Sequence, residues 1–198
     1  MKIVVLFSGG KDSALASILL EPFFDVELAT FAFDGYKTDK AGKEAALLLN
    51  LPHRTIVFED GVLEEAIGML LAAGYPRDGI NHLHAQALEV LSEDWEYLAD
   101  GTKREDRVPM MTPEQVRSLE DRKTVHYIRP LAGYGSKAIA ALASRQMVFE
   151  ALPSELFPAS DFEVGLRMAV EERWGPQVRA RMFPKNHMHT RVIRRKRI

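Results

Sequence analysis

Uninterrupted apolar runs alternate with amphipathic segments along most of the chain. The run Ile3-Val4-Val5-Leu6 predicts a buried strand, and Leu15, Ile18 and Leu19 then recur at helical spacing. The same two signals repeat further along the chain. Strands are predicted at 26–33, 53–58, 95–99 and 125–128, and helices at 41–49, 63–71, 81–92 and 138–144.

This order predicts an α/β fold with a doubly wound, parallel, five-stranded sheet, because strands separated by helices form crossovers that cover both faces. We expect residues 1–152 to form this domain. Residues 153–198 are too few to bury much core of their own, so we expect a C-terminal extension packed on the domain. Two capping motifs predict further helix starts, Thr112-Pro113-Glu114-Gln115 and Ser160-Asp161-Phe162-Glu163.

Composition limits the class of protein. The 198 residues are 46% hydrophobic, which is enough for a core, and no cysteine is present. Disulfides, cysteine-ligated zinc and iron–sulfur clusters are therefore excluded. The sequence has no run of 18 apolar residues, so no membrane span is predicted. Met1-Lys2 leads directly into the first strand and leaves no room for a signal peptide, so we expect a cytoplasmic protein.

Charge is unevenly placed, although the net charge is only −2. Residues 185–198 contain no acid and six cations: Lys185, Arg191, Arg194, Arg195, Lys196 and Arg197. A basic end on an acidic body favours contact with a polyanion such as RNA. A solubilising or oligomer-pairing end is an equally good interpretation.

The segment between the first strand and the first helix carries the clearest chemistry. Gly9 and Gly10 let the backbone approach a phosphate closely, and the following helix directs free N–H groups and its positive dipole end into the turn. Lys11 adds a positive charge, and Ser8 and Ser13 add hydroxyl donors. Strand, glycine turn and helix together predict a phosphate-binding loop.

The commoner phosphate motifs do not fit this loop. A Walker A motif would need glycine at position 5 and Ser or Thr at position 12, where the chain has Val5 and Asp12. The segment Ser8-Gly9-Gly10-Lys11-Asp12-Ser13 instead resembles the pyrophosphate loop of the PP-loop ATP pyrophosphatases. That superfamily, also called the N-type or alpha-hydrolase group, includes NAD synthetase, GMP synthetase, tRNA 2-thiolation enzymes and diphthine–ammonia ligase.

The resemblance implies a Rossmann-like (HUP-type) fold, ATP and Mg²⁺ as cofactors, and transfer of AMP to a substrate oxygen with release of pyrophosphate. Residues 8–13 would bind the nucleotide, with Lys11 and Asp12 as the catalytic pair. A nitrogen or sulfur nucleophile would then displace AMP. Because the chain has no cysteine to carry sulfur, ammonia, an amine or sulfur from a separate donor is favoured.

A second polar segment follows the predicted fourth strand. Gly101, Thr102 and Asp106 resemble the second conserved block of the superfamily, which implies nucleotide contacts for the first two. Asp12 and Asp106 would hold Mg²⁺ against the ATP oxygens, with Glu105 as the alternative to Asp106. A solvated polar loop is the other interpretation of this segment. Asp12 is also in place to cap its helix.

Three further residues are candidates through the resemblance. The end of the second strand contacts adenine in the superfamily, which implies a stacking role for Phe33, although a core position also fits its alternation with Phe31. Arg129 and Lys137 resemble basic residues that face phosphates or nucleic acid in tRNA-modifying branches. An ordinary strand-to-helix loop explains them equally well.

The acceptor remains open between RNA, tRNA included, and a small molecule or cofactor precursor. A non-catalytic ATP- or AMP-binding regulatory module and an RNA-binding protein using the basic end are the alternatives. Small chains of this class often complete their sites by pairing, so a homodimer is compatible. The pairs His82/His84 and His187/His189 lack an evident third zinc ligand.

Overall fold

The computed structural model describes residues 1–154, 159–183 and 188–196. Its main sheet is parallel throughout, with the order β3-β2-β1-β4-β5. The strands are β1 (Lys2–Leu6), β2 (Asp25–Ala32), β3 (His53–Val57), β4 (Tyr97–Ala99) and β5 (His126–Ile128). The predicted fold class is confirmed, and each strand lies within or close to its predicted range.

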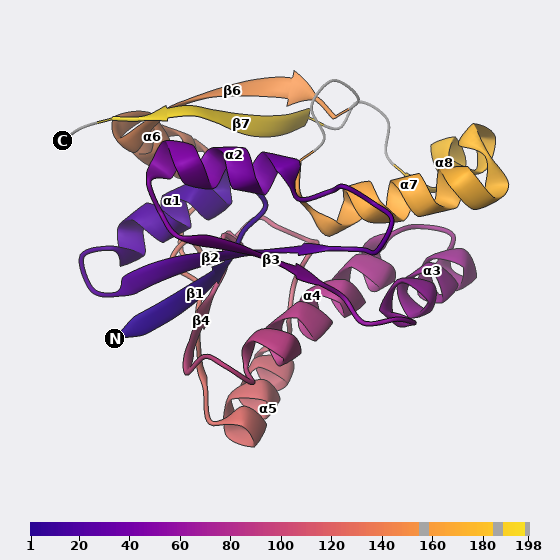
Figure 1. Ribbon diagram of the computed structural model, residues 1–198, viewed down its shortest axis with the longest axis horizontal. Helices are drawn as coiled ribbons and strands as arrows, with labels where there is room; N and C mark the ends of the chain where they lie inside the picture. Colours follow the sequence, from indigo (N-terminus) through magenta and orange to yellow (C-terminus); the bar gives the residue numbers. More distant parts are fainter. Residues whose placement is uncertain (155–158, 184–187, 197–198) are drawn as a thin grey trace.

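Helices cover both faces of this sheet (Figure 1). One layer contains α1 (Lys11–Leu20), α2 (Lys40–Leu49) and α6 (Ser136–Gln146), and the other contains α3 (Val62–Ala73), α4 (Arg77–Leu91) and α5 (Pro113–Lys123). Each layer buries its own apolar cluster against the sheet. The helix α7 (Phe162–Trp174) joins the second cluster through Phe162, Leu166 and Val170, and α8 (Pro176–Met182) follows it.

One of the two predicted capping motifs is confirmed. Thr112 Oγ1 accepts from Gln115 N at 3.3 Å, and Gln115 Oε1 accepts from Thr112 N at 2.8 Å, so α5 begins with a capping box. The second motif was assigned to the wrong residue. Asp161 caps α7 by accepting from Val164 N, whereas Ser160 Oγ accepts from Gly42 N, 118 residues away.

The C-terminal part of the chain adds a small second sheet. The strand β6 (Met147–Pro153) pairs in antiparallel with β7 (Met188–Arg195), and the predicted boundary at 152/153 falls inside β6. The two strands lie over α1, α2 and α6, on the side away from the main sheet (Figure 1). Neither strand was predicted.

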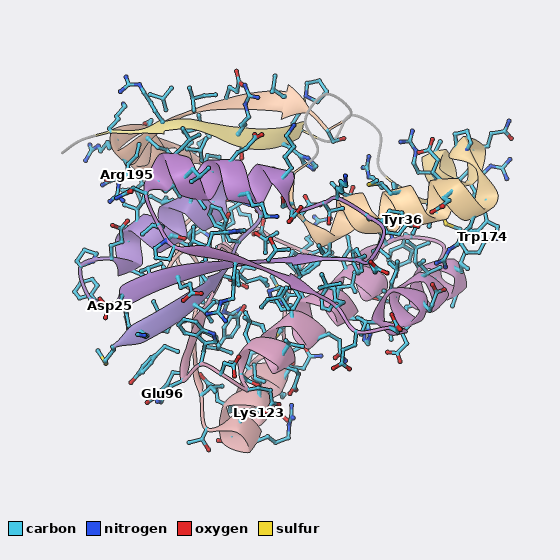
Figure 2. All side chains as sticks on the ribbon, viewed as in Figure 1. Asp25, Tyr36, Glu96, Lys123, Trp174 and Arg195 are labelled. Carbon is cyan, nitrogen blue, oxygen red and sulfur yellow. The ribbon has the colours of Figure 1, made fainter. Side chains whose placement is uncertain are left out.

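The basic end is thereby folded onto the body. Arg191 pairs with Glu150 at 2.7 Å, and Arg195 pairs with Glu21 at 2.8 Å (Arg195 is labelled in Figure 2). Lys196 donates to the carbonyl of Ser144. Arg194 is exposed on β7, and the cations at 185 and 197 lie outside the described residues. In the described part of the chain, none of the helices has the length and apolar character needed to cross a bilayer.

Candidate functional site

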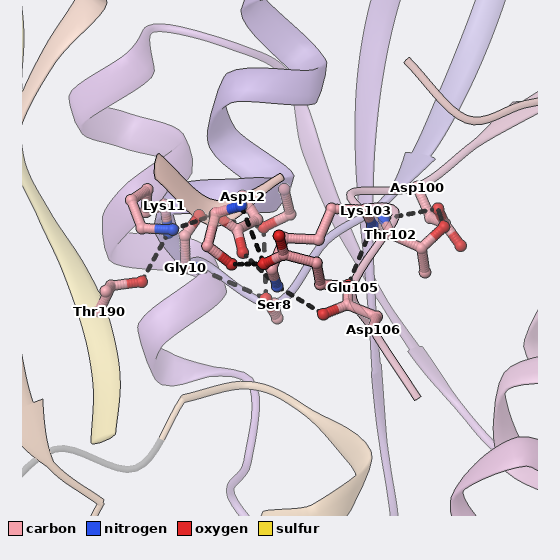
Figure 3. A network of polar contacts seen from close by, with 12 residues as sticks. Ser8, Gly10, Lys11, Asp12, Asp100, Thr102, Lys103, Glu105, Asp106 and Thr190 are labelled. Atoms are coloured by element: carbon pink, nitrogen blue, oxygen red, sulfur yellow. Dashed lines mark hydrogen bonds and ion pairs between the residues drawn. The ribbon is translucent and has the colours of Figure 1, made fainter. Parts of the chain in front are cut away.

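The site lies where the strand order reverses. β1 pairs with β2 on one side and β4 on the other, and Val5 of β1 stands opposite Ala99 of β4. Loops that follow two adjacent parallel strands meet at the same sheet edge, which is where open α/β sheets bind ligands. The segments 8–13 and 100–106, predicted separately, therefore lie side by side (Figure 3).

Two glycines allow these segments to lie close to neighbouring backbone. Gly9 has a φ of +77°, and a Cβ there would lie 2.6 Å from the carbonyl oxygen of Ala41. A Cβ on Gly101 would lie 2.6 Å from the backbone nitrogen of Ser13. No side chain fits at either position without moving backbone, so Gly9 lets the first loop lie against α2 and Gly101 lets the second loop lie against the first.

Charged side chains from both loops converge in front of α1 (Figure 3). Lys11 pairs with Asp12, and Lys103 Nζ lies 3.1 Å from Asp12 Oδ2 while also pairing with Asp106. Lys103 was not among the predicted site residues. Burial lowers the pKa of Lys103, but its bonds to Asp106 and Asp12 outweigh this and hold the pKa above its usual value.

The Asp12–Lys103–Asp106 group fits a cation site. Two carboxylates from different loops share one ammonium, so a positive charge between them is favoured, and Mg²⁺ bound by one or two carboxylates plus phosphate would take that place. Glu105 is directed elsewhere, since its carboxylate accepts from Ser136 N at 3.1 Å and Ser136 Oγ at 2.7 Å. Within the described residues, no group of three or more His, Asp or Glu side chains forms a ready-made metal site.

A cavity of about 280 Å³ opens beside these charges. Its walls include the predicted Ser8, Asp12, Ser13, Gly101, Thr102 and Asp106. The other walls are apolar side chains, a buried polar pair formed by His84 and Asp100, and the polar side chains of Ser160, Asp161 and Glu163. The cavity thus has a charged end at the phosphate loop and a mainly apolar end, a pattern typical of small-molecule sites.

Asp100 is the centre of a buried hydrogen-bond network. Its Oδ1 accepts from Thr102 N at 2.9 Å and Thr102 Oγ1 at 2.7 Å. Its Oδ2 accepts from His84 Nε2 at 2.7 Å and from the hydroxyl of Tyr127. Burial raises the pKa of Asp100, but the hydrogen bonds from His84, Tyr127 and Thr102 outweigh burial and hold that pKa below its usual value. The carboxylate therefore fixes the turn that carries Gly101.

The C-terminal extension also reaches the phosphate loop. Thr190 Oγ1 on β7 accepts from Lys11 N at 2.9 Å, and Ser160 N donates to Ser8 O at 3.0 Å. Neither contact was predicted, because both join residues more than 150 positions apart. One of the loop's N–H groups is consequently occupied by the protein itself in this structure.

The cavity is not lined by the other candidates, which are Gly9, Gly10 and Lys11 of the phosphate loop and Phe33, Arg129 and Lys137. Phe33 is buried, stacks on Phe58 at 5.3 Å and fits against Gly165, while its neighbour Phe31 lines the cavity. The guanidinium of Arg129 lies over the Tyr127 ring at 5.8 Å. Lys137 is exposed in the first turn of α6.

The predicted histidine pairs do not share a ligand. His84 faces Asp100, while His82 pairs with Glu65 at 3.1 Å. His189 Nδ1 accepts from Ala159 N at 2.9 Å, and residue 187 lies outside the described part. Zinc coordination by adjacent histidines is therefore not supported for the described residues.

A larger cleft of about 910 Å³ lies near Tyr36 (labelled in Figure 2) and shares Phe33 with the predicted site. It contains no residue of the phosphate loop and is lined by several carboxylates, among them Asp34, Glu59 and Glu171. The smaller cavity at the loop is therefore the candidate functional site.

Comparison with known proteins supports a shared fold over nearly the whole chain. An uncharacterized protein of Methanocaldococcus jannaschii, MJ0690, is 36% identical over 195 residues, which is 98% of this chain and 96% of that protein. A crystal structure described as a predicted subunit of tRNA methyltransferase from the same organism has a TM-score of 0.92 and 35% identity. It covers 100% of this chain and 98% of its own.

A more distant structure, NMN synthetase from Francisella tularensis, has a TM-score of 0.49 and 15% identity over 73% of this chain and 60% of its own. Likeness at that level says nothing about activity. A family model described as a family of unknown function, DUF7411, matches residues 1–194. With this match over nearly its full length, the chain belongs to the DUF7411 family.

Proposed function

We propose that this protein is an ATP pyrophosphatase that binds Mg-ATP at residues 8–13 and transfers AMP to an oxygen of an acceptor. The observation that carries the proposal is that the two loops line one cavity through Ser8, Asp12, Ser13 and Asp106, with Lys103 paired to both aspartates. Lys11 and Lys103 beside that end and the N–H groups at the start of α1 suit a polyphosphate, and the rest of the cavity suits a small organic group.

The proposed reaction needs positive charge at the pyrophosphate that leaves. The acceptor oxygen attacks the α-phosphorus of ATP, the bond to the β-phosphate breaks, and pyrophosphate leaves. Lys11 and the N–H groups of the loop would stabilise the negative charge that develops on this leaving group. Asp12 and Asp106 would hold Mg²⁺, which supplies further positive charge between the phosphates. Gly101 and Thr102 would keep the second loop against the first.

A nucleophile then displaces AMP from the acceptor. Ammonia, an amine or sulfur from a separate donor could serve, since the chain itself has no cysteine. For the acceptor we favour RNA, tRNA included, because a structure so similar along its full length is described as a predicted tRNA methyltransferase subunit. Arg129 and Lys137 would contact such an acceptor outside the cavity.

Replacing Lys11 or Asp12 with alanine is expected to abolish AMP formation while leaving the melting temperature close to that of the wild type. Both side chains are partly exposed, so their loss removes charge at the phosphates without opening the core. Lys40→Ala is the matched control, because Lys40 is 82% exposed on α2 and pairs with Glu44 of the same helix. Full turnover in both loop variants would exclude the proposed chemistry.

The reaction is tested by chromatography of the nucleotides formed from Mg-ATP with cell extract divided into RNA and small-molecule fractions. AMP and pyrophosphate that depend on one fraction would support adenylation and identify the acceptor class. ADP and phosphate would contradict the predicted bond cleavage. Bound ATP without turnover in any fraction would favour a regulatory nucleotide-binding module, the alternative function.

A further inference from the structure

The apolar end of the loop cavity has one polar atom left over. Both oxygens of Asp100 already accept two hydrogen bonds each, from Thr102 and from His84 with Tyr127. The Nδ1 of His84 is buried and has no hydrogen-bond partner among the described residues. His84 is 1% exposed and lines the cavity. Buried polar atoms normally have a hydrogen-bond partner, so we expect a ligand to supply one to this nitrogen.

The network determines what this atom can bind. An ionised carboxylate has no hydrogen to donate, so the Nε2 of His84 must carry the hydrogen in its bond to Asp100. In the neutral imidazole the second nitrogen, Nδ1, is then an acceptor. The missing partner is accordingly a hydrogen-bond donor.

The surrounding walls indicate the shape of that partner. Leu6, Phe31, Ile80, Val108 and Phe162 line the same cavity as His84. Apolar and aromatic walls beside the unpaired acceptor of His84 suit a flat heterocycle that carries an N–H donor. The opposite end of the cavity is the phosphate loop, so base and phosphates of one nucleotide can occupy it together.

We propose that this cavity holds the adenine base of ATP and that Nδ1 of His84 accepts a hydrogen bond from the exocyclic amino group. The inference rests on the proposed function, because it needs ATP at the loop. In this arrangement His84 determines the specificity for the base, and Asp100 determines which nitrogen of His84 carries the hydrogen. Inosine triphosphate, which has a carbonyl oxygen where adenine has the amino group, would leave Nδ1 unpaired.

The test compares the binding of ATP, inosine triphosphate and tripolyphosphate by calorimetry. We expect the wild type to prefer ATP over inosine triphosphate by about tenfold, the value of one hydrogen bond with its desolvation. His84→Gln can still donate to Asp100 from its amide but has no atom at Nδ1, so this preference is expected to disappear. Tripolyphosphate affinity should not change.

Two further variants sharpen the comparison. In Asp100→Asn the amide can donate to Nε2, which moves the imidazole hydrogen to Nδ1 and should shift the preference toward inosine triphosphate. His82→Gln is the matched control, since His82 lies on the same helix but pairs with Glu65 instead of lining the cavity. It should bind as the wild type does.

The wild type provides a measurement that no folding defect can obscure. The ¹⁵N resonance of His84 Nδ1 should move on addition of ATP but not of tripolyphosphate. A wild-type ATP preference retained in His84→Gln, or an unmoved Nδ1 resonance in ATP-saturated protein, would overturn the inference and place adenine elsewhere, as at Phe33. Absence of any ATP binding by the wild type would instead overturn the proposed function.

Discussion

Replacing Asp100 with alanine is expected to lower the free energy of unfolding by about 3–5 kcal/mol at neutral pH. The substitution removes one carboxylate but leaves its donors behind, on His84, Thr102 and Tyr127, in a region where Asp100 itself is 3% exposed. Buried donors that lose their acceptor carry the full penalty of desolvation. Urea unfolding followed by circular dichroism measures the difference.

The pKa of Asp100 also predicts how the stability difference between wild type and Asp100→Ala depends on pH. Because the pKa of Asp100 is lower in the folded protein than in the unfolded chain, its ionised form stabilises the fold. This contribution is complete above the unfolded pKa of about 4 and is lost as the pH falls through the folded value. The gap between wild type and Asp100→Ala should therefore stay constant from about pH 7 to 5 and narrow below about pH 4.

Asp121→Ala is the control for this experiment. Asp121 is exposed on α5, and loss of such a surface carboxylate usually changes stability by less than about 0.5 kcal/mol. If Asp100→Ala were destabilised by no more than the control, the buried network would not fix the loop as we describe. A gap that widened toward acid pH would contradict the direction of the pKa shift.

The main sheet could be predicted from the sequence because each of its elements has a strong local signal. Apolar runs such as Ile3-Val4-Val5-Leu6 need no distant partner to be recognised as buried strands. The second sheet lacks that signal. In β7 the cations Arg191, Arg194 and Arg195 interrupt the apolar positions, and only pairing with β6 and contact with Glu21 and Glu150 make the strand favourable.

The site likewise has one part that the sequence predicts and one part that it does not. The phosphate loop is six consecutive residues, so its chemistry is visible in the sequence. The Asp100 network joins α4, β5 and the end of β4, and no spacing along the chain indicates that His84 and Tyr127 meet one carboxylate. Lys103 could have been noticed, because it stands between the candidates Thr102 and Asp106 in a short loop. Its ion pair with Asp12, 91 positions away, could not.

Gly101→Ala is expected to lower the free energy of unfolding by about 1–3 kcal/mol and to weaken ATP binding by at least about tenfold. The added methyl carbon would lie 2.6 Å from Ser13 N and 2.7 Å from Ser13 Cα, both of them backbone atoms that no side-chain rotation can move. Either the second loop moves away from α1 or the first turn of α1 shifts. Both movements separate Asp106 from Asp12 and misplace the N–H groups at the phosphates.

Gly68→Ala separates this effect from the general effect of adding a methyl group. Gly68 lies inside α3, and a Cβ there meets no atom within 4 Å, so helix propensity should make the variant about as stable as the wild type or up to about 1 kcal/mol more stable. ATP affinity is measured by calorimetry and the free energy of unfolding by urea denaturation, for both variants. If Gly101→Ala bound ATP as tightly as Gly68→Ala, close contact between the two loops would not be needed for the nucleotide, and the cavity they enclose would not be its site.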